Sequence, residues 1–135
     1  MTTETEATMT TTHVWPCLTY ANARAAIAFL VDAFGFVEKA VYGEGDRVDH
    51  AELTWPAGGG VMLGSRREDS VLADLPAGVG AIYLVTDGPD ALHDRAVAAG
   101  ATVVQGLKDE DYGSRGFTCR DPEGVFWSFG TYAGE

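Results

Sequence analysis

His13-Val-Trp-Pro-Cys-Leu-Thr-Tyr20 is a strand-like segment, followed by a helix-like segment, residues 22–34, and then by Gly35. The same order returns as Val79-Gly-Ala-Ile-Tyr-Leu-Val-Thr86, then residues 87–99, then Gly100. Matching residues of the two copies are 65 positions apart. This offset separates Gly35 from Gly100, Asn22 from Asp87 and Gly59 from Gly124. One offset that holds at three points without a gap indicates a duplicated unit.

Each copy predicts one strand, one helix and three shorter strands. Asn22 and Asp87 are residue types that cap helix N-termini, and Gly35 and Gly100 suit the left-handed position just past a helix C-terminus. The further strands are expected at residues 37–43, 48–55, 61–65, 102–105, 113–120 and 124–132. Two tandem βαβββ modules predict an α+β fold with one curved mixed or antiparallel sheet. Helices would cover its convex side and leave an open cleft on its concave side.

The length of 135 residues suits one domain. We expect a disordered tail at residues 1–12 and a single domain at residues 13–132. Within that domain, module 1 spans 13–65, a linker spans 66–78 and module 2 spans 79–132. The start shows no signal-peptide pattern, and no apolar run approaches the ~20 residues that a membrane helix needs. We therefore expect a cytoplasmic protein in which Cys17 and Cys119 are reduced.

The charge of the chain narrows the classes of partner. The formal net charge is -11, which disfavours nucleic acid and anionic membranes because their phosphates would be repelled. The same charge mildly favours cationic ligands. We expect no nucleic-acid partner and no membrane partner.

Two stretches resemble a known superfamily. They are residues 16–35 and Asp121-Pro-Glu-Gly-Val-Phe-Trp-Ser-Phe-Gly130. Both resemble the glyoxalase/bleomycin-resistance/extradiol dioxygenase (vicinal oxygen chelate) superfamily. His50-Ala-Glu-Leu53 and Tyr112-Gly-Ser-Arg115 resemble its bleomycin-resistance-like branch. The resemblance spans residues 13–132 and implies a small-molecule cleft. It also implies a homodimer, because relatives usually border their clefts at a dimer interface.

Metal-dependent members of that superfamily take ligands from the first and last strands of each copy. By position, the four residues here are Trp15, Leu63, Gly80 and Ser128. None carries the imidazole, carboxylate or thiolate that a divalent ion needs. His13 lies on the same strand face as Trp15 but would lack three partners. We expect no metal and no other cofactor.

Strand alternation and the offset of 65 assign the side chains of the cleft. The predicted ligand-binding residues are Trp15, Cys17, His50, Glu52, Leu63, Ile82, Arg115, Phe117, Phe126 and Ser128. This mixture of aromatic, aliphatic and polar groups suits a small organic molecule, aromatic or cationic in character. The sequence thus predicts a glyoxalase/bleomycin-resistance-like protein that binds an antibiotic or a metabolite without a metal.

Other interpretations of the same residues stay open. The chain is alternatively an enzyme, a lyase, isomerase or dioxygenase of the same superfamily. Such an enzyme would use an unrecognised metal site, or His50 and Glu52 as catalytic acid and base. His50 and Glu52 are also consistent with a solvated sheet face. Arg115 could form a structural ion pair with Glu52. Trp15 could fill the space left by the missing metal.

Overall fold

The computed structural model describes residues 12–135, so the predicted tail lies outside the described residues except for Thr12. The elements are β1 (Cys17–Tyr20), α2 (Ala23–Phe29), η1 (Leu30–Phe34), β2 (Val37–Glu44), β3 (Arg47–Thr54), β4 (Gly60–Ser65), β5 (Ala81–Val85), α3 (Pro89–Ala98), β6 (Thr102–Asp109), β7 (Arg115–Arg120) and β8 (Phe126–Gly130). The order is βαβββ twice, as predicted. None of the helices within these residues is long and apolar enough to cross a membrane.

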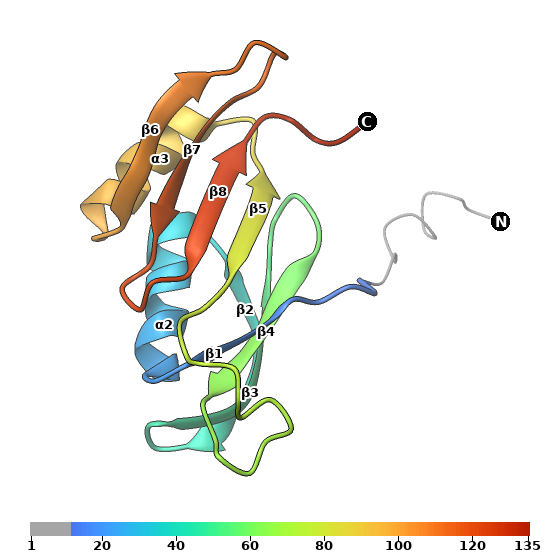
Figure 1. The fold of residues 1–135 in the computed structure, drawn as a ribbon, viewed down its shortest axis with the longest axis vertical. Coiled ribbons are helices and arrows are strands. Elements are labelled where there is room, and N and C mark those ends of the chain that lie inside the picture. The colour runs from blue at the N-terminus through green and yellow to red at the C-terminus, as the bar shows by residue number, and fades with distance from the viewer. Residues whose placement is uncertain (1–11) are drawn as a thin grey trace, which may run out of the picture.

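The strands form two four-stranded sheets, which we call sheet 1 and sheet 2. Sheet 1 has the order β1-β4-β3-β2, and sheet 2 has the order β5-β8-β7-β6. In each sheet the first pair is parallel and the others are antiparallel. Figure 1 shows sheet 2 broad side on, with α3 behind it. The α+β class is confirmed, but the eight strands do not hydrogen-bond into the single sheet that we expected.

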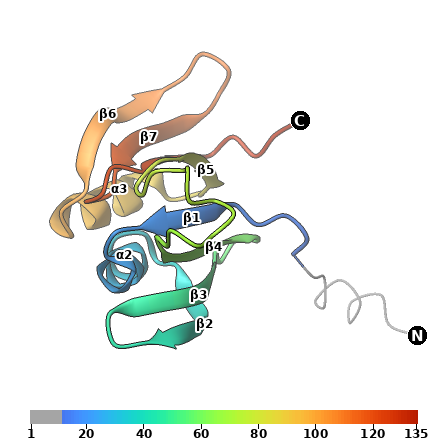
Figure 2. The same cartoon turned by 60° about the horizontal axis from the view of Figure 1, so that its bottom comes forward.

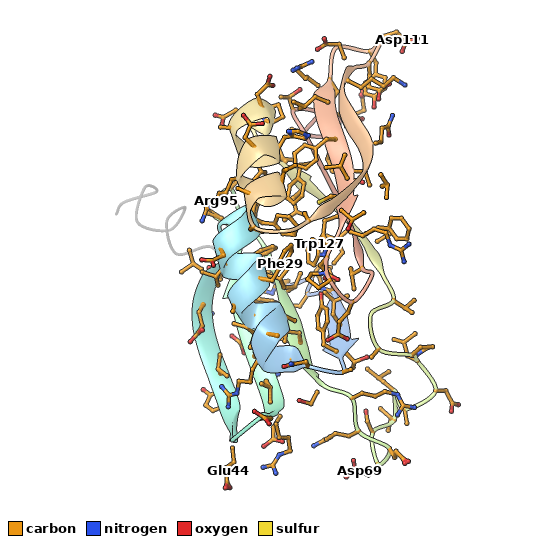
Figure 3. The ribbon with its side chains drawn as sticks, turned by 90° about the vertical axis from the view of Figure 1, so that its left-hand side faces the viewer. Phe29, Glu44, Asp69, Arg95, Asp111 and Trp127 are labelled. Carbon is orange, nitrogen blue, oxygen red and sulfur yellow. The ribbon has the colours of Figure 1, made fainter. Side chains whose placement is uncertain are left out.

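One hydrophobic core serves both modules. The ring of Phe34 at the end of η1 lies 4.8 Å from that of Phe129 and 5.5 Å from that of Trp127. Phe36 contacts Trp55 of its own module and Trp127 of the other. Figure 2 shows α2 and α3 on one side of the molecule, and Figure 3 shows Trp127 behind them. Neither module therefore completes a core alone.

Asp121, at the end of β7, is a buried carboxylate that joins the modules. Its Oδ2 accepts hydrogen bonds from the hydroxyl of Tyr20 in β1 (2.6 Å) and from Nε1 of Trp127 (3.0 Å). Its Oδ1 accepts three backbone N–H groups of the following turn, residues 123–125. A buried carboxylate needs this many donors, because they replace the water that it has lost.

The first helix is capped at both ends from module 2. Asn22 caps Ala25 N as predicted, and the Glu123 carboxylate accepts from the backbone N–H groups of Ala21 and Asn22 at 2.7 and 2.8 Å. At the other end, the Arg95 guanidinium donates to the carbonyl oxygens of Val31 and Asp32 at 3.1 and 2.7 Å. Figure 3 shows Arg95 where the two helices meet. Each charge has the sign that the helix dipole favours.

The second helix begins one residue later than predicted. Its N-cap is Gly88, with no side-chain hydrogen bond, so the prediction that Asp87 caps this helix is wrong. Pro89 then occupies the first helical position, where its missing N–H costs nothing.

The structural repeat has an offset of 66 over most of its length rather than 65. The Trp55 turn, closed by Gly58 N to Trp55 O, matches the Asp121 turn, closed by Gly124 N to Asp121 O, and 121 minus 55 is 66. The offset is 65 between Gly35 and Gly100 and along the first residues of β2 and β6, where Val37 corresponds to Thr102. The π-helical turn η1 inserts one residue before Gly35, as a π-bulge does. The register shifts along β6 accompany the return to 66.

Candidate functional site

The side of each sheet that faces away from the core is its free face. Leu53 and Ala51 of β3 are buried on the core side, so His50, Glu52 and Thr54 occupy the free face of sheet 1. The strand register places Met62 beside both Cys17 and Glu52 on this face. The alternation predicted for β3 is therefore confirmed.

A hollow of about 170 Å³ opens on the free face of sheet 1. Its walls include Cys17, Thr19, His50, Met62 and Gly64 of the sheet, together with Arg66, Arg67, Ser70 and Leu72 of the linker. The linker is fastened over the sheet by Arg66 N to Tyr20 O (3.1 Å) and Gly78 N to Thr19 O (2.9 Å). The segment predicted as a linker thus also forms a wall of this hollow.

His50 and Glu52 form a hydrogen-bonded pair on this face. His50 Nε2 lies 2.9 Å from Glu52 Oε2, and Lys39 Nζ lies 3.8 Å from the other carboxylate oxygen. The hydrogen bond with His50 is the main cause that holds the pKa of Glu52 below its ordinary value. An ionised Glu52 assigns the proton to His50 Nε2, which leaves Nδ1 as an acceptor. The pair can therefore act as an acid–base unit or hold a polar ligand group.

The free face of sheet 2 has a separate hollow of about 200 Å³. Hydroxyl groups dominate it: Thr118 and Ser128 share a hydrogen bond of 2.8 Å, and Tyr83 donates to the Tyr132 carbonyl at 2.7 Å. Gln105, Glu110, Tyr112 and Ser114 complete its walls. The sequence prediction missed Tyr83 and Thr118. An offset of 66 would have identified them as the module 2 counterparts of Cys17 and Glu52, which were predicted to bind the ligand.

Six of the ten predicted ligand-binding residues lie on or beside the free faces. Cys17, His50 and Glu52 are on sheet 1, and Phe126 and Ser128 are on sheet 2. Trp15 precedes β1, is half-buried, and donates from Nε1 to the Thr12 carbonyl at 3.2 Å. These six positions belong to two separate faces rather than to one cleft within the chain.

The other four positions correct the prediction. Leu63 and Phe117 each border a hollow, but both are 3% exposed and belong to the core, against which Ile82 packs. Arg115 is bound to Asp90 (2.8 Å) and Asp109 (3.1 Å), so the predicted pairing with Glu52 is also wrong. The cause is the offset. Side chains alternate between the two faces of a strand. An offset of 65 instead of 66 therefore assigns every side chain of the counterpart strand to the wrong face.

The residues at the superfamily's chelating positions do not fit a divalent metal ion. With the offset of 66, the counterpart of Ser128 becomes Met62 rather than Leu63, and the counterpart of Trp15 becomes Ala81 rather than Gly80. Indole, thioether, methyl and hydroxyl side chains supply no imidazole, carboxylate or thiolate. Within residues 12–135, no three His, Cys, Asp or Glu side chains are grouped as metal ligands would be.

The comparisons agree with this architecture. A sequence model of the Glyoxalase/Bleomycin resistance protein/Dioxygenase superfamily matches residues 12–129. An uncharacterized protein of Mycobacterium bovis is 36% identical over 125 residues, covering 85% of this chain and 80% of that protein. The crystal structure of TioX from Micromonospora sp. ML1 superposes with a TM-score of 0.77 at 29% identity, covering 89% of this chain and 98% of TioX.

A superfamily member from Sphaerobacter thermophilus shares the fold at 16% identity, with a TM-score of 0.67 over 87% of this chain and 96% of its own. The duplicated βαβββ unit, the two free faces and the match over residues 12–129 agree on one assignment. The chain belongs to the glyoxalase/bleomycin resistance protein/dioxygenase superfamily.

Proposed function

We propose that this protein binds a small organic molecule, an antibiotic or a metabolite, and does so without a metal ion. The observation that carries the proposal is the chemistry of the four chelating positions, Trp15, Met62, Ala81 and Ser128. An aromatic ring, a thioether and a hydroxyl suit contact with a flat organic molecule better than they suit coordination. The hydroxyls of sheet 2 and the His50–Glu52 pair of sheet 1 would supply the directional contacts.

A second copy of the chain completes the site in this proposal. Each hollow lies on one sheet and the loops beside it, and each is smaller than the ~300 Å³ at which typical ligand sites begin. Figure 1 shows sheet 2 broad side on, whereas Figure 3, a quarter turn away, shows sheet 1 behind α2. The free faces of one chain thus point in different directions. A homodimer that lays sheet 2 of one copy over sheet 1 of the other would join the two hollows.

Thermal denaturation with a panel of aromatic and cationic natural products tests the binding proposal. A ligand of the native state raises Tm, and the rise should be the same with EDTA as with added Zn²⁺ or Mn²⁺. Ser128→Arg, which fills the hollow of sheet 2, should abolish the rise. Val97→Arg is the matched control, because Val97 is 47% exposed on α3, away from both free faces.

Two results would overturn this function. One is a panel that leaves Tm unchanged throughout, and the other is stabilisation that EDTA removes. Sedimentation velocity tests the dimer separately. A species of twice the chain mass of 14.3 kDa is expected at micromolar concentration, and a monomer at every concentration would exclude the composite site.

A metal-free acid–base enzyme is the second candidate, favoured by the 2.9 Å contact between His50 and Glu52. A histidine and a carboxylate in contact can serve as general acid and base, which contributes roughly 10²- to 10⁴-fold to a rate. If a screen of isomerisations and epimerisations in EDTA finds turnover, His50→Ala and Glu52→Gln should each lower kcat by that order. Turnover that survives both substitutions would exclude this mechanism.

A cytoplasmic location is part of the same proposal. Both cysteines are free thiols, Cys17 exposed and Cys119 buried, as is usual in a reducing compartment. Rapid alkylation of Cys17 in intact cells is the expected result, and an oxidised Cys17 would argue for another compartment.

A further inference from the structure

The hollow on sheet 1 contains a notch made by a glycine. The register pairs Thr19 of β1 with Gly64 of β4, and its continuation brings His50 of β3 to the other side of Gly64. All three residues line the hollow. Because Gly64 has no side chain, Thr19 and His50 stand as two walls above its backbone. A Cβ atom added to Gly64 would lie 3.2 and 3.3 Å from the carbonyl oxygens of Val48 and Asp49, which border the same space. They are two strands apart, or roughly 10 Å, which is enough space for a small planar group.

The hydroxyl of Thr19 lacks a hydrogen-bond partner. Among residues 12–135, Thr19 Oγ1 is the buried side-chain oxygen or nitrogen for which the structure provides none. A buried polar group left unsatisfied costs roughly 1–3 kcal/mol. Thr19 lines the hollow, so its hydroxyl is a candidate donor to a molecule from outside the chain.

Module 2 contains the same notch but fills it. At the offset of 66, Gly130 is the counterpart of Gly64, and Tyr83 is the counterpart of Cys17. A Cβ atom added to Gly130 would lie only 2.6 Å from Tyr83 Oη, so the phenol occupies the space above that glycine. In module 1 the short side chain of Cys17 stands at the Tyr83 position, with its Sγ 3.6 Å from the Trp15 carbonyl oxygen. The notch of module 1 is therefore open because of one residue.

One arginine that lines the notch has no carboxylate partner. Of the charged residues that line it, Asp49 is paired with Arg47, His50 with Glu52, and Arg67 with Asp69. Arg66 differs, because it donates to the Ala73 carbonyl at 2.8 Å and has no carboxylate within 4.0 Å among residues 12–135.

We propose that the notch over Gly64 is a subsite for a carboxylate group of the bound molecule. The inference rests on the binding function proposed above and names the chemistry of one end of the ligand. Thr19 Oγ1 donates to one carboxylate oxygen, and the Arg66 guanidinium supplies charge-assisted hydrogen bonds. Met62 and Cys17 contact the apolar remainder of the ligand. The notch would therefore bind an anionic group, whereas the net charge of the chain alone favours cationic ligands.

Three probes of one shape test the charge of the ligand. Benzoate, benzamide and benzamidine differ at the same position in being anionic, neutral and cationic. Each is titrated into ¹⁵N-labelled full-length protein, and ¹H–¹⁵N spectra follow the amide signals of Thr19, Gly64 and Met62. Benzoate is expected to shift these signals with saturation at millimolar concentration, benzamide more weakly, and benzamidine not at all.

Matched variants test the residues. Arg66→Gln should weaken benzoate roughly three- to tenfold, whereas Arg67→Gln should change it little because Arg67 is already paired with Asp69. Cys17→Tyr copies the filled notch of module 2 and should abolish the shifts. Thr19→Val keeps the shape and should weaken benzoate while leaving the apo protein equally or more stable, since it removes an unsatisfied hydroxyl.

The outcomes separate this inference from the function on which it rests. Benzamidine shifting these amides as strongly as benzoate, or benzoate binding unchanged in Arg66→Gln and Thr19→Val, overturns the carboxylate subsite. In that case stabilisation by the natural-product panel would still support a binding protein. Shifts by benzoate that Cys17→Tyr abolishes, in a variant with a native-like spectrum, support the subsite.

Discussion

Replacing Asp121 by alanine should remove the acceptor of five hydrogen bonds at once. The severe part of the loss falls on Tyr20 and Trp127, because both are 0% exposed and their O–H and N–H groups cannot turn to water. Each buried donor without a partner costs roughly 1–3 kcal/mol, so the pair costs roughly 2–6 kcal/mol. That is a large share of the ~5–15 kcal/mol by which domains are stable.

Two further variants separate the contributions. In Asp121→Asn, an NH₂ group replaces the oxygen that faces Tyr20 and Trp127. The Tyr20 hydroxyl can accept a hydrogen bond from this group, but the Trp127 N–H is a donor and loses its acceptor. The expected loss in the free energy of unfolding is therefore about 1–3 kcal/mol. Tyr20→Phe in the Asp121→Ala background removes a donor that has already lost its partner. The double variant should therefore lose less stability than the sum of the single variants.

Urea denaturation at pH 7, followed by tryptophan fluorescence and by circular dichroism, measures these free energies of unfolding. The two signals should coincide if the modules unfold together. The reasoning is refuted if Asp121→Ala loses less than about 1 kcal/mol, or if it and Tyr20→Phe are additive, since both results would mean that the buried donors find other partners.

Three other perturbations have signs set by the structure. Burial raises the pKa of Tyr20 above its ordinary value of 10.0 and that of Cys119 from 9.0 to about 12. The stability contributed by protonated Cys119 is complete below about pH 9, and that contributed by protonated Tyr20 is complete below about pH 10. Each falls above that pH by ~1.4 kcal/mol per pH unit, and urea midpoints independent of pH up to 11 would contradict this. Glu123→Ala, which uncaps the first helix, should cost about 1 kcal/mol in urea denaturation, and an unchanged midpoint would count against the cap. Leu63→Ala should lower the free energy of unfolding by roughly 2–5 kcal/mol, and Met62→Ala, at a half-buried position, should lower it clearly less. A larger loss for Met62→Ala would mean that Leu63 faces the cleft, as the sequence predicted.

The faces of individual strands show what could be predicted from the sequence. In β3, polar His50 and Glu52 alternate with apolar Ala51 and Leu53, so the pattern itself assigned the free face correctly. In β5, Ala81-Ile-Tyr-Leu-Val85 has no charged or strongly polar residue, so nothing local distinguishes its two sides. Its face was inferred from the repeat offset, and a one-residue error turned it over.

That error came from features that a sequence repeat does not distinguish. Asp87 is followed by Gly88, and Gly59 lies between two other glycines, so an offset of 65 or 66 matches plausible residues at both points. The extra residue in η1 has no sequence signature that we recognised. It becomes visible only in the hydrogen bonds that place Gly35 after a π-helical turn.

The contacts that join the modules lay beyond pattern analysis for another reason. Asp121 was identified as part of a turn motif, and the three backbone N–H groups it accepts are what such a turn requires. Its hydrogen bond to Tyr20 spans 101 residues, and no periodicity or capping rule connects side chains across that separation. Glu123 acts on the first helix over the same separation of 101 residues, and Arg95 acts on it over 64 residues.

The dependence of the first helix on Arg95 and Glu123 has a consequence for the chain as it is synthesised. A ribosome adding ~5–20 residues per second needs about 5–20 s to advance the 101 residues from Tyr20 to Asp121. During that time β1 and α2 have been made together with the Asn22 cap, but Glu123 and the Asp121 partner of the Tyr20 hydroxyl have not yet been added. The apolar side of the nascent first module is then open to chaperones, or to the same segment of a neighbouring nascent chain, until β7 and the turn after it leave the ribosome.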